Sequence, residues 1–362
     1  MSLKVLTILG TRPEIIRLSR IIPKLDDVCN HKILHTGQNY DPLLNEIFFN
    51  ELGIRSPDII IDNKGTSFAE QIGNTFKGVE NYVNEFKPDK VLILGDTNSG
   101  LSAFICERLG IPVYHMEAGN RCFDLKVPEE KNRKVIDSIS SINLPYTNLS
   151  RENLLREGVP NNRIHVTGNP IKEVIDHYDT KIQNSNILEK LNLEKGKYII
   201  ATAHRAENVD DEQRLKNLFN SFEEIAKEYK IVFSCHPRTK QKLEKFGMNI
   251  DNPNIIICEP LGFFDFVKLE KNSYMAITDS GTVQEEMCLF NKPTVTIRDT
   301  TERPETVWCG SNIVSGLEKE QILLCYERMK QTETSWEIPM GYNKDNVSDT
   351  VINIVCSNKE VK

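Results

Sequence analysis

The chain has 362 residues, which at roughly 150 residues per domain predicts about two domains, each large enough for its own core. Lys and Arg number 45 and Asp and Glu number 52, so the formal net charge is −7. This balance argues against a protein that coats nucleic acid or an acidic membrane. It does not exclude an anionic small substrate, which needs only local positive charge.

The nine cysteines are an odd count with no CxxC pair and no His spacing suited to zinc, so we expect reduced, mostly buried thiols and no metal. No dinucleotide-binding GxGxxG motif occurs either, and we predict no NAD or other cofactor. The first ten residues lack the features of a signal peptide, and nowhere do about 18 apolar residues follow one another. We therefore expect a cytoplasmic protein that contacts neither membrane nor nucleic acid.

Short apolar, β-branched runs recur along the chain, each followed by a turn and a helix-length amphipathic stretch. Such alternation is typical of a parallel sheet covered on both faces. The expected strands are Val5–Leu9, Lys32–His35, Val91–Leu94, Val113–His115, Ile142–Tyr146 and Ile164–Val166, then Tyr198–Ala203, Ile231–Cys235, Asn254–Ile257, Tyr274–Thr278, Thr294–Ile297 and Ile313–Val314. Twelve strands exceed one ordinary doubly wound sheet, so we predict an α/β protein with two Rossmann-like domains.

The natural break follows Val166, where a Gly-Asn-Pro turn leads into one helix, Ile171–Tyr178, and a polar stretch, 179–197. We place an N-terminal domain at 1–169 and a C-terminal domain at 170–345. A final helix lies in 346–362, with Ser348 or Asp349 as its N-cap. Open α/β sheets bind ligands beyond the carboxyl ends of their strands, so we expect the two sheets to face each other across a cleft.

The turn after the first strand, Gly10-Thr11-Arg12-Pro13, continues to Arg17. Gly10 permits a tight turn, and Pro13 suits the first position of a helix. A helix N-terminus with two arginines nearby favours an anion. An ordinary turn with two solvated arginines explains this segment equally well.

Three carboxylates follow neighbouring strands of the first domain: Asp96, Glu117, and either Glu129 or Glu130. A lone Asp96 is better explained as a helix N-cap. Carboxylates delivered together to one edge of a sheet, however, are typical of acid and base chemistry.

Charged strand ends recur in the second domain. His204 with Arg205 ends one strand, and His236 with Arg238 ends the next, although a lone histidine is more often structural. Further on, Ser280 and Gly281 open a helix whose N–H groups suit a phosphate.

A carboxylate one turn into that helix is suited to a ribose diol, although Glu285 is also explained by a capping box. The loop that follows the next strand carries five charges, among them Arg298, Glu302 and Arg303. A charge run is usually a solvated face, but this one lies where the ligand is expected.

The segments GTRPEIIR, GDTNS, HMEAGNR, PEEKNR, the strand-end HR, DSGTVQEE and RDTTERPE occur in an order and spacing that resemble the non-hydrolysing UDP-N-acetylglucosamine 2-epimerases. The resemblance runs from about Val5 to about Glu305. It implies the fold of the GT-B glycosyltransferases, a last helix that crosses back to the first domain, and a homodimer.

The resemblance also implies reversible epimerisation at C2 of a UDP-2-acetamido sugar, of the UDP-GlcNAc to UDP-ManNAc type, for surface polysaccharide precursors. UDP is eliminated to give a 2-acetamidoglucal and is added back after C2 is protonated from the opposite face. The implied acid and base group is Asp96, Glu117 and Glu129, with His204 beside the leaving phosphate. The implied UDP and substrate contacts are Arg12, Arg17, Arg133, Arg205, Ser280, Gly281, Glu286, Arg298, Glu302 and Arg303.

The chain departs from the family pattern at Arg17, where a lysine is usual, and at Asn120 and Cys122. Gln38-Asn39-Tyr40-Asp41 replaces a QHRE-like segment that helps bind a second, activating UDP-GlcNAc in bacterial members. The strings AGNRCFD and HRAENVD are more similar to a branch that acts on other sugars, such as the precursor of UDP-N-acetyl-L-fucosamine. The exact sugar thus stays open. A GT-B glycosyltransferase, a hydrolysing epimerase and a non-catalytic UDP-sugar sensor are the alternatives.

Overall fold

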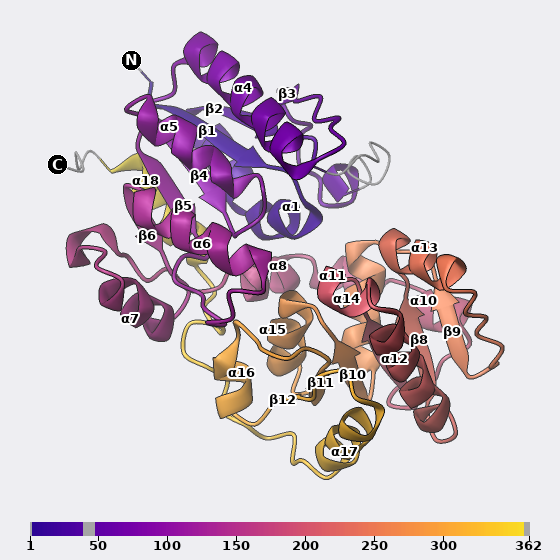
Figure 1. Cartoon of the computed structure of the whole chain (residues 1–362). Helices are drawn as coiled ribbons and strands as arrows, with labels where there is room; N and C mark the ends of the chain where they lie inside the picture. The colour runs from indigo at the N-terminus through magenta and orange to yellow at the C-terminus, as the bar shows by residue number, and fades with distance from the viewer. Residues whose placement is uncertain (1, 39–47, 358–362) are drawn as a thin grey trace. The chain divides into compact units, whose positions relative to one another are not determined.

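The computed structural model describes residues 2–38 and 48–357, and it divides the chain into two compact units. Unit 1 comprises Met1–Asp176 and Met340–Lys362, and unit 2 comprises His177–Pro339 (Figure 1). Within the described residues each unit holds one six-stranded sheet whose paired strands are all parallel. The predicted α/β class with two doubly wound sheets is confirmed.

The sheet of unit 1 has the order β3-β2-β1-β4-β5-β6. Its strands are β1 (Lys4–Leu9), β2 (Asn30–His35), β3 (Ile59–Ile60), β4 (Lys90–Leu94), β5 (Val113–Met116) and β6 (Ile142–Leu144). Its helices are α1 (Arg12–Leu18), α2 (Ile21–Val28), α4 (Phe68–Phe86), α5 (Ala103–Arg108), α6 (Pro128–Ile139), α7 (Asn148–Arg156), α8 (Ile171–His177) and α18 (Val347–Cys356), with 3-10 turns at Gly100–Ser102 and Asn161–Arg163. Apolar residues of α4, α5 and α6 pack with those of the strands in one cluster, so these three helices cover one face of the sheet.

The sheet of unit 2 has the order β12-β11-β10-β7-β8-β9. Its strands are β7 (Tyr198–Thr202), β8 (Lys230–Ser234), β9 (Ile255–Cys258), β10 (Met275–Thr278), β11 (Thr294–Thr296) and β12 (Asn312–Val314). Its helices are α9 (Asp179–Gln183), α10 (Ile187–Lys190), α11 (Ala206–Val209), α12 (Glu212–Ile225), α13 (Pro237–Lys245), α14 (Phe263–Asn272), α15 (Gly281–Leu289), α16 (Pro304–Trp308) and α17 (Lys319–Lys330). Helices α12 and α17 pack on one face of the sheet, and α10, α14 and α15 pack on the other.

The structure differs from the predicted strands at two places in unit 1. The predicted strand Ile164–Val166 is not formed, because only Ile164 makes a bridge, to Asn143. The sixth strand of this sheet is instead β3, a two-residue edge strand beside β2. The run Ile59-Ile60-Ile61 is apolar and β-branched, but it is only three residues long and is not among the predicted strands.

The structure adds two short helices to the predicted ones and corrects the start of the last helix. The polar stretch 179–197 carries the short helices α9 and α10. The final helix α18 begins after Asn346, so neither Ser348 nor Asp349 is its N-cap. Ser348 is buried and donates to the Glu173 carboxylate from its backbone N–H and its hydroxyl, while Asp349 pairs with Lys24 at 2.6 Å.

Helix α18 packs against α2 within unit 1. Lys90 Nζ donates to the carbonyls of Val355 and Ser357, at 2.6 and 2.7 Å, and so places a cation at the C-terminus of the helix, where the helix dipole favours it. All nine cysteines are free thiols, four of them buried and five partly exposed. Across 2–38 and 48–357 we find no helix with the length and apolar content needed to span a bilayer.

Candidate active site

The turn between β1 and α1 packs tightly against its neighbours. A Cβ atom at Gly10 would lie 2.1 Å from Thr36 Oγ1 and 2.2 Å from Ser99 Oγ, so this position requires glycine. The Glu14 carboxylate accepts from the backbone N–H groups of Gly10 and Thr11, at 2.6 and 3.1 Å, and from Thr97 Oγ1 at 2.5 Å. Glu14 therefore ties the start of α1 to the loop that follows β4.

The two predicted arginines of α1 have different surroundings. The Arg12 guanidinium lies over the Phe48 ring, 5.2 Å from its centroid. Arg17 is 3% exposed, and its Nη1 donates to Glu117 Oε2 at 2.6 Å. The structure thus brings Arg17 together with one of the three predicted carboxylates.

Glu117 follows β5 in a left-handed conformation, with φ of 65°. This conformation is costly for a residue other than glycine and is often found at functional sites. The Glu117 carboxylate also accepts from the Tyr146 hydroxyl at 3.3 Å and from Asn120 Nδ2 at 3.4 Å. Its orientation is therefore fixed by groups from three segments of unit 1.

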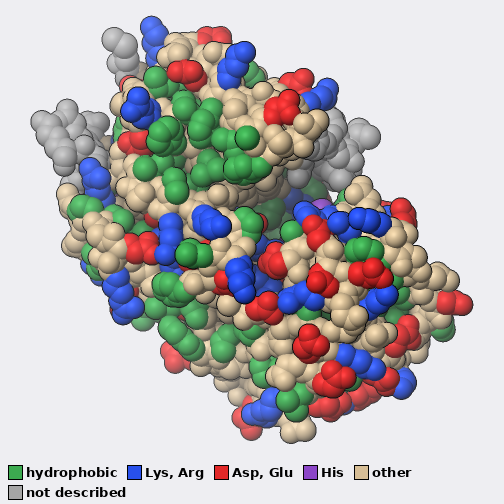
Figure 2. All heavy atoms as spheres, viewed as in Figure 1, with side chains coloured by type: hydrophobic (Ala, Val, Ile, Leu, Met, Phe, Trp, Pro, Cys, Tyr) green, Lys and Arg blue, Asp and Glu red, His purple; other side chains and the backbone are tan. Residues whose placement is uncertain are grey.

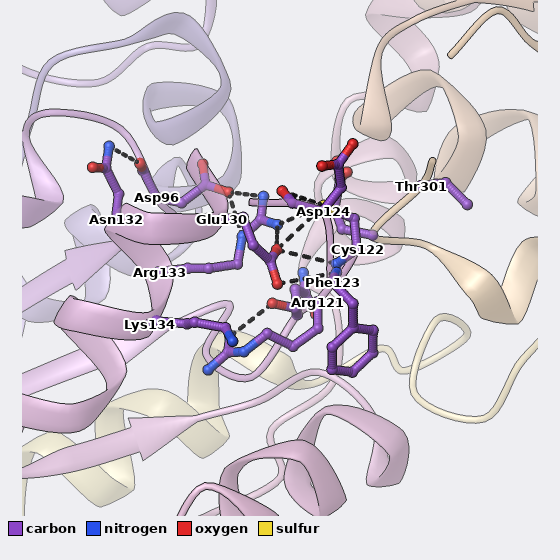
Figure 3. Close-up of polar contacts among 12 residues, drawn as sticks. Asp96, Arg121, Cys122, Phe123, Asp124, Glu130, Asn132, Arg133, Lys134 and Thr301 are labelled. Carbon is purple, nitrogen blue, oxygen red and sulfur yellow. Dashed lines mark hydrogen bonds and ion pairs between the residues drawn. The ribbon is translucent and has the colours of Figure 1, made fainter. Parts of the chain in front are cut away.

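Asp96 follows β4, and its partner comes from α6 (Figure 3). Arg133 donates to Asp96 Oδ2 from Nε at 3.0 Å and from Nη2 at 2.5 Å, and its Nη1 contacts Glu130 Oε2 at 2.5 Å. Arg133 is 2% exposed, whereas a quarter of the Asp96 side chain is accessible. Arg133 is thus buried between two carboxylates, of which only Asp96 reaches solvent.

The structure separates the roles of Glu129 and Glu130, which the sequence left open. Glu130 is fully buried, and besides Arg133 it accepts from the backbone N–H groups of Cys122 and Phe123, both at 3.1 Å. Glu129 lies in the first turn of α6 and is partly exposed. Glu130 therefore holds the loop that precedes α6, and Glu129 is the carboxylate that a ligand can reach.

The same helix holds the loop that carries Glu117. Asp137 of α6 accepts from the Gly119 N–H at 3.0 Å and lies 2.8 Å from His115 Nδ1 and 2.7 Å from Arg121 Nη1. Burial acts to raise the pKa of Asp137, but the contacts with His115 and Arg121 outweigh it and hold that pKa below its usual value. A single helix thus organises the segments of all three predicted carboxylates.

In unit 2, His204 follows β7 and lies against Asp279, which follows β10. Asp279 Oδ2 accepts from the backbone N–H groups of His204 and Arg205, both at 2.8 Å, and from Asn208 Nδ2 at 3.1 Å. Asp279 Oδ1 lies 3.0 Å from His204 Nδ1. Asp279 has no accessible surface, whereas 38% of the His204 side chain is exposed.

Four of the predicted charged residues of unit 2 meet in one buried network. Glu302 lies 2.7 Å from Arg298 Nη1, 3.6 Å from Arg205 Nη2 and 3.7 Å from Arg303 Nη1. Glu285 pairs with Arg303 Nε, so it does not form the capping box considered for it. Three arginines and two glutamates thus meet within unit 2.

The helix start beside this network is formed by Ser280 and Gly281. A Cβ atom at Gly281 would lie 2.7 Å from Glu302 Oε1, so glycine permits the close approach of α15 to the charged loop. In this structure the Ser280 N–H donates to Thr278 Oγ1 at 2.9 Å. Gly281 is the other predicted backbone donor, and Glu286, in the second turn of α15, is 3% exposed.

Sequence reasoning did not assign roles to Asp137 and Asp279, which hold the neighbours of the predicted site residues. Asp279 directly follows a buried strand in the segment Thr278-Asp279-Ser280-Gly281, and that position was the available signal. Of the segment Gln38–Asp41, only Gln38 belongs to the described residues, so the expectation about an activating UDP-sugar lies outside them. Within 2–38 and 48–357, no three His, Cys, Asp or Glu side chains are grouped as metal ligands would be.

Two doubly wound parallel sheets with charged strand ends place the chain in the GT-B-like class of α/β proteins. The family model described as UDP-N-acetylglucosamine 2-epimerase matches residues 24–356. A UDP-N-acetylglucosamine 2-epimerase of Methanococcus maripaludis is 40% identical, with 99% of each chain covered. A UDP-2,3-diacetamido-2,3-dideoxy-D-glucuronate 2-epimerase of Pseudomonas aeruginosa is 34% identical, with 89% of this chain and 90% of that protein covered.

Among solved structures, the UDP-GlcNAc 2-epimerase of Methanocaldococcus jannaschii in complex with UDP-GlcNAc and UDP matches with a TM-score of 0.92. Its identity is 39%, and the match covers 97% of this chain and 99% of that one. The chain therefore belongs to the UDP-N-acetylglucosamine 2-epimerase family, whose members are isomerases.

Proposed function

We propose that this enzyme interconverts UDP-GlcNAc and its C2 epimer, UDP-ManNAc, and so supplies surface polysaccharide precursors. The observation that carries the proposal is that Asp96 and Glu117, at the ends of neighbouring strands, each accept from a buried arginine. Carboxylates held in fixed orientations suit proton transfer at a sugar carbon. The names of the relatives above support the same reaction.

The proposed reaction removes the C2 proton to a carboxylate while the bond from C1 to the phosphate oxygen breaks. The electron pair of the C–H bond forms the C1–C2 double bond of 2-acetamidoglucal, and UDP leaves with the pair of the C–O bond. A second carboxylate then protonates C2 from the opposite face, and UDP adds back to C1. Asp96, Glu117 and Glu129 are proposed as the acid and base group, which titrates as a set.

Because the C2 proton is not acidic, stabilisation of the departing UDP has to supply much of the rate. The cluster of Arg205, Arg298 and Arg303 supports a role for unit 2 in holding UDP, since guanidinium groups are suited to bind phosphate oxygens. His204 is proposed to contact the leaving phosphate, and Glu286 the ribose. On the side of unit 1, Arg12 and Arg17 are proposed to help hold the diphosphate.

A different UDP-2-acetamido sugar is the second candidate substrate. The Pseudomonas relative is named for another sugar nucleotide, so membership of the family leaves the sugar open. Asn120 lies directly beside Glu117 and is held by Ser150 Oγ at 2.8 Å. A residue that departs from the family pattern and touches a proposed acid or base is suited to select the sugar.

The test is incubation with UDP-GlcNAc in D2O, followed by NMR, and then with a panel of UDP-2-acetamido sugars. We expect deuterium at C2 of the sugar nucleotide and a mixture of two epimers, with no acceptor present. Absence of exchange with every UDP-sugar would contradict the proposal. Release of free UDP with N-acetylmannosamine would identify a hydrolysing enzyme, and sugar transfer that needs an acceptor would identify a glycosyltransferase.

We further propose that the enzyme is a homodimer that buries an apolar face of unit 1. Phe68 of α4 is 60% exposed and Phe104 of α5 is 44% exposed, and Figure 2 shows apolar side chains gathered on this side of unit 1. Contiguous apolar patches on a protein surface often mark contacts with another protein chain. Analytical ultracentrifugation should give twice the chain mass, and Phe104→Asp should shift the distribution toward the monomer.

A further inference from the structure

The two carboxylate oxygens of Asp279 have different contacts, and the proposed function does not account for this difference. Oδ2 of Asp279 is occupied by three donors: the backbone N–H groups of His204 and Arg205 and the amide of Asn208. Oδ1 has no accessible surface and no well-aligned hydrogen bond, and it lies at ion-pair distance from His204 Nδ1, at 3.0 Å. One oxygen thus shapes the loop, and the other is left for the imidazole.

The chemistry of the pair fixes which ring nitrogen carries the proton. Burial acts to raise the pKa of Asp279, but the charge of His204 and the backbone donors hold it well below its usual value, so the side chain is an acceptor only. An imidazole nitrogen beside such an acceptor is protonated. Nδ1 of His204 therefore carries a hydrogen, and Nε2 is the nitrogen that a ligand meets.

Among the described residues that surround His204, Asp279 is the acidic side chain in contact with its ring. His236 is the N-cap of α13, and its ring lies 5.7 Å from the His204 ring, centroid to centroid. Arg205 points toward Glu302, and Arg238 is paired with Asp210 at 2.5 Å. Of these groups, only Asp279 contacts a ring nitrogen of His204 in the structure.

We propose that Asp279 is a positioning residue of the enzyme: it holds His204 with Nδ1–H directed inward, so that Nε2 faces the phosphate of the UDP-sugar and donates a hydrogen bond to it when the imidazole is protonated on both nitrogens. This inference rests on the proposed function for the identity of the ligand. Asp279 touches no reacting atom and acts through His204. An aspartate that holds a histidine in one tautomer serves the same purpose in the serine hydrolases.

The first measurement is the tautomer of His204, read from the imidazole 15N chemical shifts of the full chain at alkaline pH, where histidine is neutral. The His204→Ala spectrum assigns the signals. We expect the Nδ1–H form in the wild type and a shift to the Nε2–H form in Asp279→Asn. The amide of Asn can keep the backbone contacts through its oxygen but presents N–H groups to Nδ1.

The second measurement is turnover in a double-mutant cycle. Asp279→Asn should lower kcat by ~10²-fold, the scale of acid and base assistance, and should have no effect within about twofold when His204 is already Ala. Asn208→Ala is the matched control, because it removes a donor from Oδ2 and leaves the contact of Oδ1 with His204. This control should lower the thermal midpoint and leave the tautomer unchanged.

Two results would overturn the inference. One is an Nε2–H tautomer of His204 in the wild type, which does not depend on whether Asp279→Asn folds. The other is an equal loss of kcat from Asp279→Asn in the His204→Ala background. The tautomer is measured without turnover. A chain that shows the expected tautomers but exchanges no deuterium into any UDP-sugar would overturn the proposed function instead.

Discussion

Arg133 donates twice to one oxygen of Asp96, from Nε at 3.0 Å and from Nη2 at 2.5 Å. The same guanidinium contacts Glu130 through Nη1. A planar guanidinium can satisfy both carboxylates at fixed angles, which the single ammonium of a lysine cannot do. The orientation of Asp96 therefore depends on an arginine, and not only on a positive charge, at position 133.

Arg133→Lys should accordingly lower turnover by roughly 10- to 100-fold, the equivalent of losing one hydrogen bond to a charged group. The measurement is the rate of deuterium exchange at C2. Lys134→Ala is the control on the same helix, because Lys134 is 40% exposed and lies 3.7 Å from its partner Glu157. Equal rates for Arg133→Lys and the wild type would contradict the role given to this pair.

Asp96→Asn and Glu117→Gln should each lower turnover by about 10²- to 10⁴-fold, because they remove proposed proton-transfer groups. UDP affinity, measured by calorimetry, should stay nearly unchanged, since UDP is proposed to be held by other residues. His204→Ala is the contrasting variant and should weaken UDP binding as well as turnover. Near-normal turnover in both carboxylate variants would refute their assignment.

Glu129→Gln and Glu130→Gln should affect different properties of the enzyme, turnover and thermal stability respectively, although the two residues are adjacent. Glu129 is partly exposed, so its variant should lose turnover and keep the thermal midpoint. Glu130 is buried against Arg133, so its variant should lower the midpoint, because a buried guanidinium loses a charged partner. Differential scanning fluorimetry beside the exchange assay separates the two, and a stable but inactive Glu130→Gln would reverse the assignment.

The sequence predicted eleven of the described strands to within one or two residues, because buried parallel strands are nearly continuous apolar runs. It failed at β3, a two-residue edge strand in the short run Ile59-Ile60-Ile61. It also failed at Ile164–Val166, an apolar run that makes one bridge. A run of apolar residues indicates that a segment is buried, but it does not indicate whether a neighbouring strand can pair with it.

For the candidate site, the sequence could place carboxylates and arginines at strand ends, but not their partners. Arg133 and Asp96 are 37 residues apart, and Asp279 and His204 are 75 apart. Such pairs depend on how helices and loops are oriented over the sheet. The same limit applied to Glu129 and Glu130, whose difference in burial follows from the helix face and not from residue type.

The buried carboxyl of Glu14 should make the free energy of unfolding depend on pH. Burial raises its pKa to about 7, against the hydrogen bonds from Thr97, Gly10 and Thr11. Because the pKa is raised above the unfolded value, the associated stability is present below about pH 4.5 and is lost as the pH rises through 7. The difference is on the order of 3 kcal/mol.

The measurement is the urea midpoint at about pH 5 and about pH 8. Relative to Glu14→Gln, the wild type should lose stability between these values. Glu70, in the same position of the first turn of α4, is the control, because hydrogen bonds from Thr66 lower its pKa. The stability that Glu70 contributes is lost as the pH falls, so the wild type should not lose stability relative to Glu70→Gln between about pH 5 and about pH 8. A wild type that keeps its stability relative to Glu14→Gln over this range would count against the burial of a carboxyl at Glu14.

Gly119 should tolerate no side chain because of its contact with Ser150, and a comparison with Gly158 separates this contact from the backbone conformation. Its φ is 80°, and a Cβ atom would lie 2.2 Å from the Ser150 carbonyl oxygen, whereas Gly158, with φ of 90°, has no atom within 4 Å of its Cβ position. Gly158→Ala should cost about 1 kcal/mol for the left-handed backbone alone, and Gly119→Ala roughly 3 kcal/mol because the loop must also move. Since this loop carries Glu117, Gly119→Ala should lower turnover even below its unfolding temperature, and Gly158→Ala should not. Equal losses of stability in the two variants would show that the backbone conformation, and not the contact with Ser150, determines the need for glycine.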